Sequence, residues 1–174
     1  MTSNATDKFQ WNSGFVTNPA PLLLQNGSIA IVYKAKPLDQ GNNSGSTMYH
    51  GVAMASDYDK PYVTINNVEP FDIPHFRADE FLWSSNNDSV FHILFQAHWN
   101  CSQQIMYSND LLNWDYYDMQ PWCSVNLTNG TDVGLLRRER PALLFDDKGE
   151  IEYLFTAVQP ESGRTFNLAQ KIGT

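Results

Sequence analysis

Short runs in which apolar and polar residues alternate recur along the whole chain. In FHILFQAH, Phe91, Ile93, Phe95 and Ala97 fall on one side of an extended backbone, which is the pattern of a half-buried β-strand. Val, Ile, Tyr, Phe and Trp are plentiful, and no window of helical length combines capping residues with an apolar stripe. The pattern predicts an all-β protein.

Three segments repeat the same order of features at a period of about sixty residues. They are TNPAPLLLQNGSIAIVYKA, ADEFLWSSNNDSVFHILFQAH and RERPALLFDDKGEIEYLFTA. Each contains a polar entry, a short apolar strand, a turn and a second strand, and after a gap a third strand follows. PYVTINN and NWDYYDM are expected to add fourth, outer strands to the first two units. Four antiparallel strands at a fixed period indicate the blades of a β-propeller.

The polar residue at the entry of each unit favours this architecture. Asn18, Asp79 and Glu139 occupy these places, 61 and 60 residues apart. A sandwich or a stack of meanders would also contain many strands, but it would not explain a polar residue at every entry. We expect one partial propeller domain over 1–174, with three four-stranded blades at about 15–67, 75–122 and 136–174.

Three blades are too few for a closed ring, because propellers have about four to eight. The third unit also ends at KIGT without an evident outer strand. We therefore expect the sequence to be an excerpt of a longer propeller, or its ring to be completed by self-association with another copy.

Charge and hydropathy exclude several classes of partner. Lys and Arg number 11 against 19 Asp and Glu, for a net charge of −8. An acidic chain without a basic run is a poor candidate for binding nucleic acid or an anionic membrane. No apolar stretch approaches the length that spans a bilayer, and MTSNATDKFQW lacks the apolar segment of a signal peptide.

Glycosylation motifs and cysteines indicate a secreted glycoprotein. Asn-x-Ser/Thr sequons occur seven times, at Asn4, Asn26, Asn42, Asn87, Asn100, Asn126 and Asn129, where composition alone would give roughly two. Cys101 and Cys123 flank a hairpin that we expect from QQIMYS, NDLLN and WDYYDM. Folding it brings the cysteines close enough for a disulfide; two separate buried thiols are the alternative.

The strand entries are the candidate site. The innermost strands of a propeller begin around its axis, so Asn18, Asp79 and Glu139 are expected to converge there. Two carboxylates, with arginines on both sides of Glu139, suit the hydrolysis of a glycosidic bond. One acid must hold a proton, which a second carboxylate favours by like-charge repulsion, while arginines orient the pair and bind substrate hydroxyls.

The motifs TNPAP, ADEFLW and RRERPALLF resemble the blade entries of five-bladed propeller glycosidases. These are the glycoside hydrolase family 43 type and its relatives, which cleave arabinosides, xylosides and related sugars. The resemblance runs from about Thr17 to Ile172 and implies blades two to four of such a protein. It implies that Glu139 is the general acid of an inverting glycosidase. Asp79 would tune the ionisation of that acid, and the general base would lie on a preceding blade.

Some positions depart from the family pattern. Glu80 replaces a proline after Asp79, and Arg140 stands where a small residue is usual. Asn18 cannot be the base, because an amide does not take up a proton at working pH. We assign Asn18 to substrate binding, together with Arg138, Arg140 and Trp99.

No histidine spacing indicates a metal site, and we expect no cofactor. Relatives often hold a calcium ion or a water in the propeller axis, but the sequence assigns no ligand for one.

Each assignment has a plainer alternative. Glu139 could form an ordinary ion pair on a rim, and Asp79 could end a strand through local hydrogen bonds. The tryptophans are more often core than sugar platforms. At the level of function, the alternatives are a glycan-binding propeller that has lost catalysis and a scaffold that binds only proteins.

Overall fold

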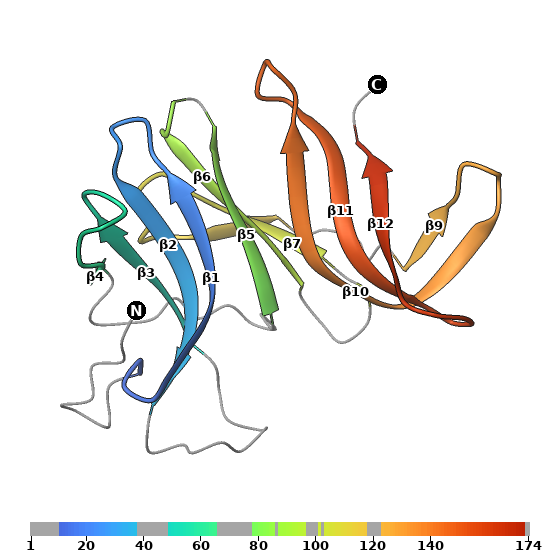
Figure 1. Ribbon diagram of the computed structural model, residues 1–174, viewed down its shortest axis with the longest axis horizontal. Helices are drawn as coiled ribbons and strands as arrows, with labels where there is room; N and C mark the ends of the chain where they lie inside the picture. Colours follow the sequence, from blue (N-terminus) through green and yellow to red (C-terminus); the bar gives the residue numbers. More distant parts are fainter. Residues whose placement is uncertain are drawn as a thin grey trace. The chain divides into compact units, whose positions relative to one another are not determined.

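The computed structural model describes residues 11–37, 49–65, 78–85, 87–96, 101, 103–117 and 123–172. The secondary structure of these residues is entirely β, and their strands form three four-stranded antiparallel sheets (Figure 1). Because these residues contain no helix, the described part of the chain has none that could cross a membrane. The prediction of an all-β chain with three four-stranded propeller blades is confirmed.

The first sheet follows the chain in simple order, as a meander. Its strands are β1 (Phe15–Leu23), β2 (Ile29–Lys36), β3 (Tyr49–Ala55) and β4 (Val63–Thr64). Gly27 closes the β1–β2 turn with a φ of 84°, a conformation that glycine adopts without steric cost. The short β4 is the outer strand that PYVTINN predicted.

The second sheet has the same order. It contains β5 (Ala78–Ser85), β6 (Val90–Gln96), β7 (Gln103–Ser108) and β8 (Asp115–Tyr117). Tyr107 pairs with Asp115 across the β7–β8 hairpin, and Asp110 organises its turn by accepting hydrogen bonds of 2.8 Å from the backbone N–H groups of Leu112 and Asn113. The expected hairpin and its outer strand are both present.

The third sheet has the order β12-β11-β10-β9. Its strands are β9 (Ser124–Asn126), β10 (Asp132–Phe145), β11 (Ile151–Pro160) and β12 (Phe166–Lys171). Its fourth strand precedes β10 in the chain, and Val125 of β9 pairs with Val133 of β10. The blade is therefore completed at its β10 edge by a hairpin, and no strand follows β12 among the described residues.

A left-handed residue marks the first strand of the first two sheets and the long β10 of the third. Asn18, Asp79 and Arg140 have φ values of 49°, 56° and 54°, and each is 61 residues from the next. The ladder shifts register around Asn18 and around Arg140, as a β-bulge does.

This backbone repeat corrects the alignment made from the sequence. The residue equivalent to Asn18 and Asp79 is Arg140, and Glu139 lies one position before it, in the place of Thr17. The alignment made from the sequence matched polar side chains and therefore paired Glu139 with Asn18. A proline follows both Asn18 and Arg140, and this shared pair of residues supports the register that the backbone shows.

The described chain groups into two compact units, each with its own core. The first comprises Met1–Pro74, Leu82–Phe91 and Ser108–Trp114, and the second comprises His75–Phe81, His92–Tyr107 and Asp115–Thr174. In the first unit a cluster forms around Tyr33, Ala35 and Ala53, and the Trp11 ring stacks on Tyr33 at 5.7 Å.

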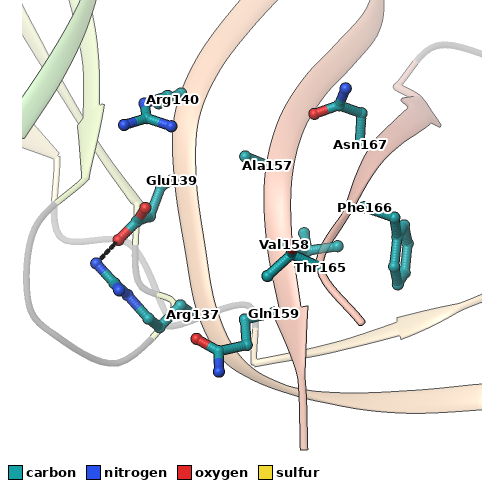
Figure 2. A pocket seen from close by; sticks show the side chains of 9 residues that line it. All are labelled: Arg137, Glu139, Arg140, Ala157, Val158, Gln159, Thr165, Phe166 and Asn167. Atoms are coloured by element: carbon teal, nitrogen blue, oxygen red, sulfur yellow. Dashed lines mark ion pairs between the residues drawn. The ribbon is translucent and has the colours of Figure 1, made fainter. Parts of the chain in front are cut away.

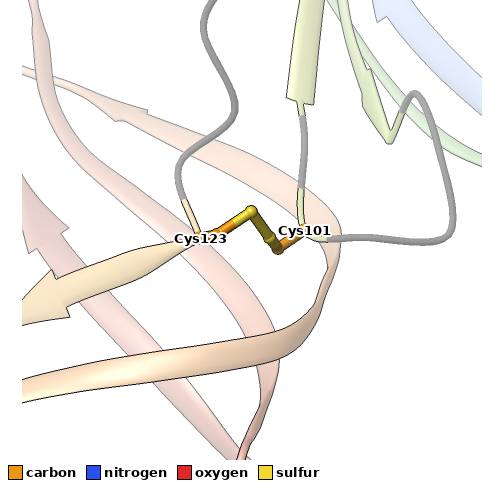
Figure 3. Close-up of a disulfide and its surroundings, with 2 residues drawn as sticks. All are labelled: Cys101 and Cys123. Atoms are coloured by element: carbon orange, nitrogen blue, oxygen red, sulfur yellow. A yellow bond between two sulfur atoms is a disulfide. The ribbon is translucent and has the colours of Figure 1, made fainter.

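The core of the second unit contains the predicted disulfide. Cys101 and Cys123 are bonded, with their Cα atoms 5.2 Å apart (Figure 3). Both pack with Val125, Leu135 and Val158. The bond ties the segment before β7 to the segment before β9, so the hairpin prediction placed the two cysteines correctly.

Candidate functional site

A hollow of about 390 Å³ opens beside the bulge of β10. We call it the Glu139 hollow (Figure 2). Its lining comes from β10, β11, β12 and the residue before β12, and consists of Arg137, Glu139, Arg140, Ala157, Val158, Gln159, Thr165, Phe166 and Asn167. Every one of these residues belongs to the second unit.

Strand register explains why the surface is hollow at this point. Glu139 pairs with Ala157 of β11, and Ala157 pairs in turn with Asn167 of β12. Directly paired residues of antiparallel strands project from the same face. The small methyl group of Ala157 thus lies between two longer polar side chains, which leaves a depression with a carboxylate at one side and an amide at the other.

Glu139 is held by an ion pair at the edge of this depression. Its Oε1 contacts an Nη of Arg137 (Figure 2). The Glu139 side chain is 18% exposed and the Arg137 side chain 49%. A ligand in the hollow can therefore reach the carboxylate, and the arginine is free on its solvent side to turn toward another acceptor.

Arg140 brings a second carboxylate to the site. Its Nε lies 3.4 Å from Oδ2 of Asp79, and the two side chains are 72% and 23% exposed. Both residues have a left-handed backbone conformation, and Arg140 lies at a register shift of its strand. Bulges re-aim side chains near functional sites, and the bulge at Arg140 accompanies a contact between a guanidinium of one sheet and a carboxylate of another.

Arg138 does not belong to this group. Its side chain is 1% exposed, and it donates hydrogen bonds to Thr156 Oγ1 at 3.2 Å and to Gln170 Oε1 at 2.7 Å. Burial lowers the pKa of this guanidinium to about 10. Arg138 thus packs within the third sheet, on the face opposite Glu139, and is not one of the residues that line the hollow.

Two more residues, Asn18 and Trp99, were assigned to substrate binding from the sequence. Asn18 is on β1 in the first unit, where its Oδ1 accepts a 2.9 Å hydrogen bond from the Thr17 hydroxyl. Its role in substrate binding stays a prediction. Trp99 lies outside the described residues.

The described residues contain no group of three or more His, Cys, Asp or Glu side chains that could hold a metal ion. A calcium ion in the propeller axis stays a prediction without assigned ligands.

Gln159, Thr165, Phe166 and Asn167 line the hollow but were not identified from the sequence. Their place depends on how β11 and β12 pair with β10. Alternation in RTFNLAQK could have indicated one of them. It puts Asn167 and Ala169 on one face of a strand and Leu168 on the other, and Leu168 is buried.

No protein-family model matches this sequence, and no curated protein matches it. Solved structures do. A candidate glycosidase from Bacteroides thetaiotaomicron superimposes with a TM-score of 0.60 at 16% identity, over 91% of this chain and 51% of that one. The GH32 β-fructofuranosidase of Bombyx mori gives a TM-score of 0.59 at 14% identity, over 90% and 33%. A candidate glycoside hydrolase from Parabacteroides distasonis gives 0.54 at 18% identity, over 86% and 48%.

At identities this low the superpositions show the fold alone. The chain is a partial β-propeller of the kind found in glycoside hydrolases, and it spans about half the length of two of these structures and a third of the other.

Proposed function

We propose that the Glu139 hollow is the acid-bearing part of a glycoside hydrolase site that cleaves glycosidic bonds in an oligosaccharide or polysaccharide. The observation that carries this proposal is the placement of Glu139, a largely buried carboxylate that still faces a hollow flanked by two arginines. A second acid, Asp79, is tied to one of them.

The lining of the hollow suits a sugar. Gln159 and Asn167 carry amides that can both donate to and accept from hydroxyl groups. The methyl group of Ala157, which lies on the same face of the sheet as Glu139 and Asn167, offers a small apolar surface for the C–H groups of a sugar ring. A few polar groups around an apolar surface are typical of small-ligand sites.

The proposed roles follow from the chemistry of inversion. Glu139 donates a proton to the leaving oxygen, and a carboxylate base activates water on the opposite side of the sugar, about 6.5–9.5 Å away. A general acid acts in its protonated form, so the substrate must draw Arg137 from Glu139 to a sugar hydroxyl. Asp79 and Arg140 orient the acid, and the base that the resemblance to family 43 implies would lie on another blade.

The disulfide supports an extracellular location. Disulfides persist in oxidising compartments and are rare in the cytosol. The Cys101–Cys123 bond thus fits a secreted protein that meets a carbohydrate outside the cell.

The test replaces the acid in the full-length protein. Glu139→Gln keeps the size of the side chain and its capacity for hydrogen bonds, but an amide cannot act as a general acid at neutral pH. We expect release of reducing ends from a panel of plant and fungal oligosaccharides to fall by about 10²–10⁴-fold, with the unfolding midpoint unchanged. The matched control, Glu150→Gln, changes an exposed acid outside the hollow and should keep full turnover. Unchanged turnover in Glu139→Gln would exclude the assignment.

A glycan-binding protein without catalysis is the second candidate. Glu139 is the one carboxylate among the described residues that line the hollow, whereas inversion needs two across the sugar. If the protein only binds glycans, Glu139→Gln should retain its affinity for oligosaccharides, and the wild-type protein should release no reducing ends.

A further inference from the structure

Two hairpins in different sheets share one sequence pattern and one turn. Leu24-Gln25-Asn26-Gly27-Ser28 joins β1 to β2, and Leu127-Thr128-Asn129-Gly130-Thr131 joins β9 to β10. In each hairpin, the leucine N–H donates a 2.8 Å hydrogen bond to the carbonyl of the fifth residue. The glycine N–H donates a 2.9 Å hydrogen bond to the leucine carbonyl. The glycines have φ values of 84° and 82°. Each tip is also an Asn-Gly-Ser/Thr sequon.

The asparagine and the hydroxyl residue of each sequon are linked directly. Asn26 Oδ1 accepts hydrogen bonds from Ser28 N at 2.9 Å and from Ser28 Oγ at 2.6 Å. Asn129 Oδ1 accepts from Thr131 N at 3.0 Å. Both asparagines are exposed, and none of these bonds uses Nδ2, the atom that a glycan would occupy.

From these two tips and the disulfide, we infer that Asn26 and Asn129 carry N-linked oligosaccharides. In this reaction Asn Nδ2 forms a bond to C1 of an N-acetylglucosamine-type sugar on a lipid pyrophosphate donor. The C1–O bond to the pyrophosphate breaks, the lipid pyrophosphate leaves, and Nδ2 loses one proton. No oxidant or reductant is needed.

The disulfide is the independent observation. Cys101–Cys123 indicates an oxidising compartment, and the enzymes that attach N-glycans act on chains that enter the secretory pathway. The inference does not depend on the Glu139 hollow, so it stands or falls separately from the proposed hydrolase.

Two other described sequons are less suited. Asn87 Oδ1 accepts a 3.1 Å hydrogen bond from Gln25 Nε2 of another hairpin, so a glycan on Asn87 would have to fit beside that hairpin. Asn126 lies within β9, paired with Asp132, and a glycan on Asn129 would crowd it. Asn4, Asn42 and Asn100 lie outside the described residues.

The experiment maps glycans on the full chain, directed into the endoplasmic reticulum of a yeast host by a cleavable leader. The secreted protein is treated with peptide N-glycosidase in heavy-oxygen water and analysed by peptide mass spectrometry. Asparagines released from a glycan take up the label, whereas Asn-Gly sites that deamidated earlier do not. We expect label at Asn26 and Asn129. An unlabelled peptide at either position overturns the assignment there.

Hydroxyl variants check that the signal comes from the sequon. Ser28→Ala and Thr131→Ala should each remove one glycan from the intact mass, while Ser28→Thr and Thr131→Ser should keep it. The matched control is Asn109→Gln, which changes an exposed asparagine outside any sequon and should leave the mass of attached glycan as it is. A glycan that persists in both alanine variants would contradict the inference.

Discussion

Arg137 and Arg138 are neighbours in sequence, but their side chains have opposite surroundings. Arg137 is half exposed and ion-paired with Glu139, whereas Arg138 is buried and bonded to Thr156 and Gln170. Alternation along β10 separates them. The sequence predicted a cluster of arginines around Glu139, but composition alone could not show which of them point to the hollow.

This separation predicts different costs of substitution. Arg138→Ala should lower the free energy of unfolding by about 2–4 kcal/mol, because it leaves a cavity and removes the donor from the buried Thr156 hydroxyl and the half-buried Gln170 amide. Arg137→Ala, the matched control, should cost about 1 kcal/mol or less, since its ion pair is partly exposed. Urea denaturation measures both. A larger loss in Arg137→Ala than in Arg138→Ala would contradict the placement of the two side chains.

At the scale of elements, the sequence revealed the repeat that contains the bulges but not the bulges themselves. The sixty-residue period and a turn in each unit were visible in the sequence. In the first and third units the turn contains a glycine, Gly27 or Gly149, with positive φ. The left-handed Arg140 was not visible, since arginine, unlike glycine, asparagine and aspartate, is not enriched in that conformation. The short β9 was also missed, because three residues are too few to show alternation.

Position 140 should therefore tolerate replacement by glycine better than replacement by alanine. Both replacements remove the contact with Asp79, but only glycine adopts a φ of 54° without cost. We expect Arg140→Gly to be more stable than Arg140→Ala by about 1 kcal/mol. At Arg137, which is not among the residues with positive φ, the order should reverse by about 0.5–1 kcal/mol. Thermal or urea unfolding of the four variants gives the result, and the same order at both positions would argue against a left-handed Arg140.

At the scale of the whole molecule, fold and site were predictable to different extents. Strand number, blade repeat and disulfide followed from local patterns such as FHILFQAH and from the cysteines on either side of one hairpin. The Glu139 hollow depends on register between distant strands, which local pattern does not encode. Ala157 and Asn167 became part of the site only once their pairing with Glu139 was known.

The disulfide should contribute substantially to the stability of the second unit. Cys101 and Cys123 are separated by 22 residues, and removing a bond across a loop of this size costs about 2–4 kcal/mol in typical cases. The double variant Cys101→Ala with Cys123→Ala should show this loss in guanidinium unfolding, and reduced wild type should match it. Equal stability of the oxidised wild type and the double variant would show that the bond is dispensable.

Binding of a sugar in the Glu139 hollow is the central claim, and an NMR titration of the labelled protein with the panel of plant and fungal oligosaccharides tests it most directly. For a sugar that binds, we predict that the largest amide shifts fall on residues 137–140, 157–159 and 165–167. In Arg140→Ala the affinity should fall by about tenfold or more, as expected when a hydrogen bond to a charged group is lost. Shifts confined to other parts of the chain, or no binding by any member of the panel, would contradict the account.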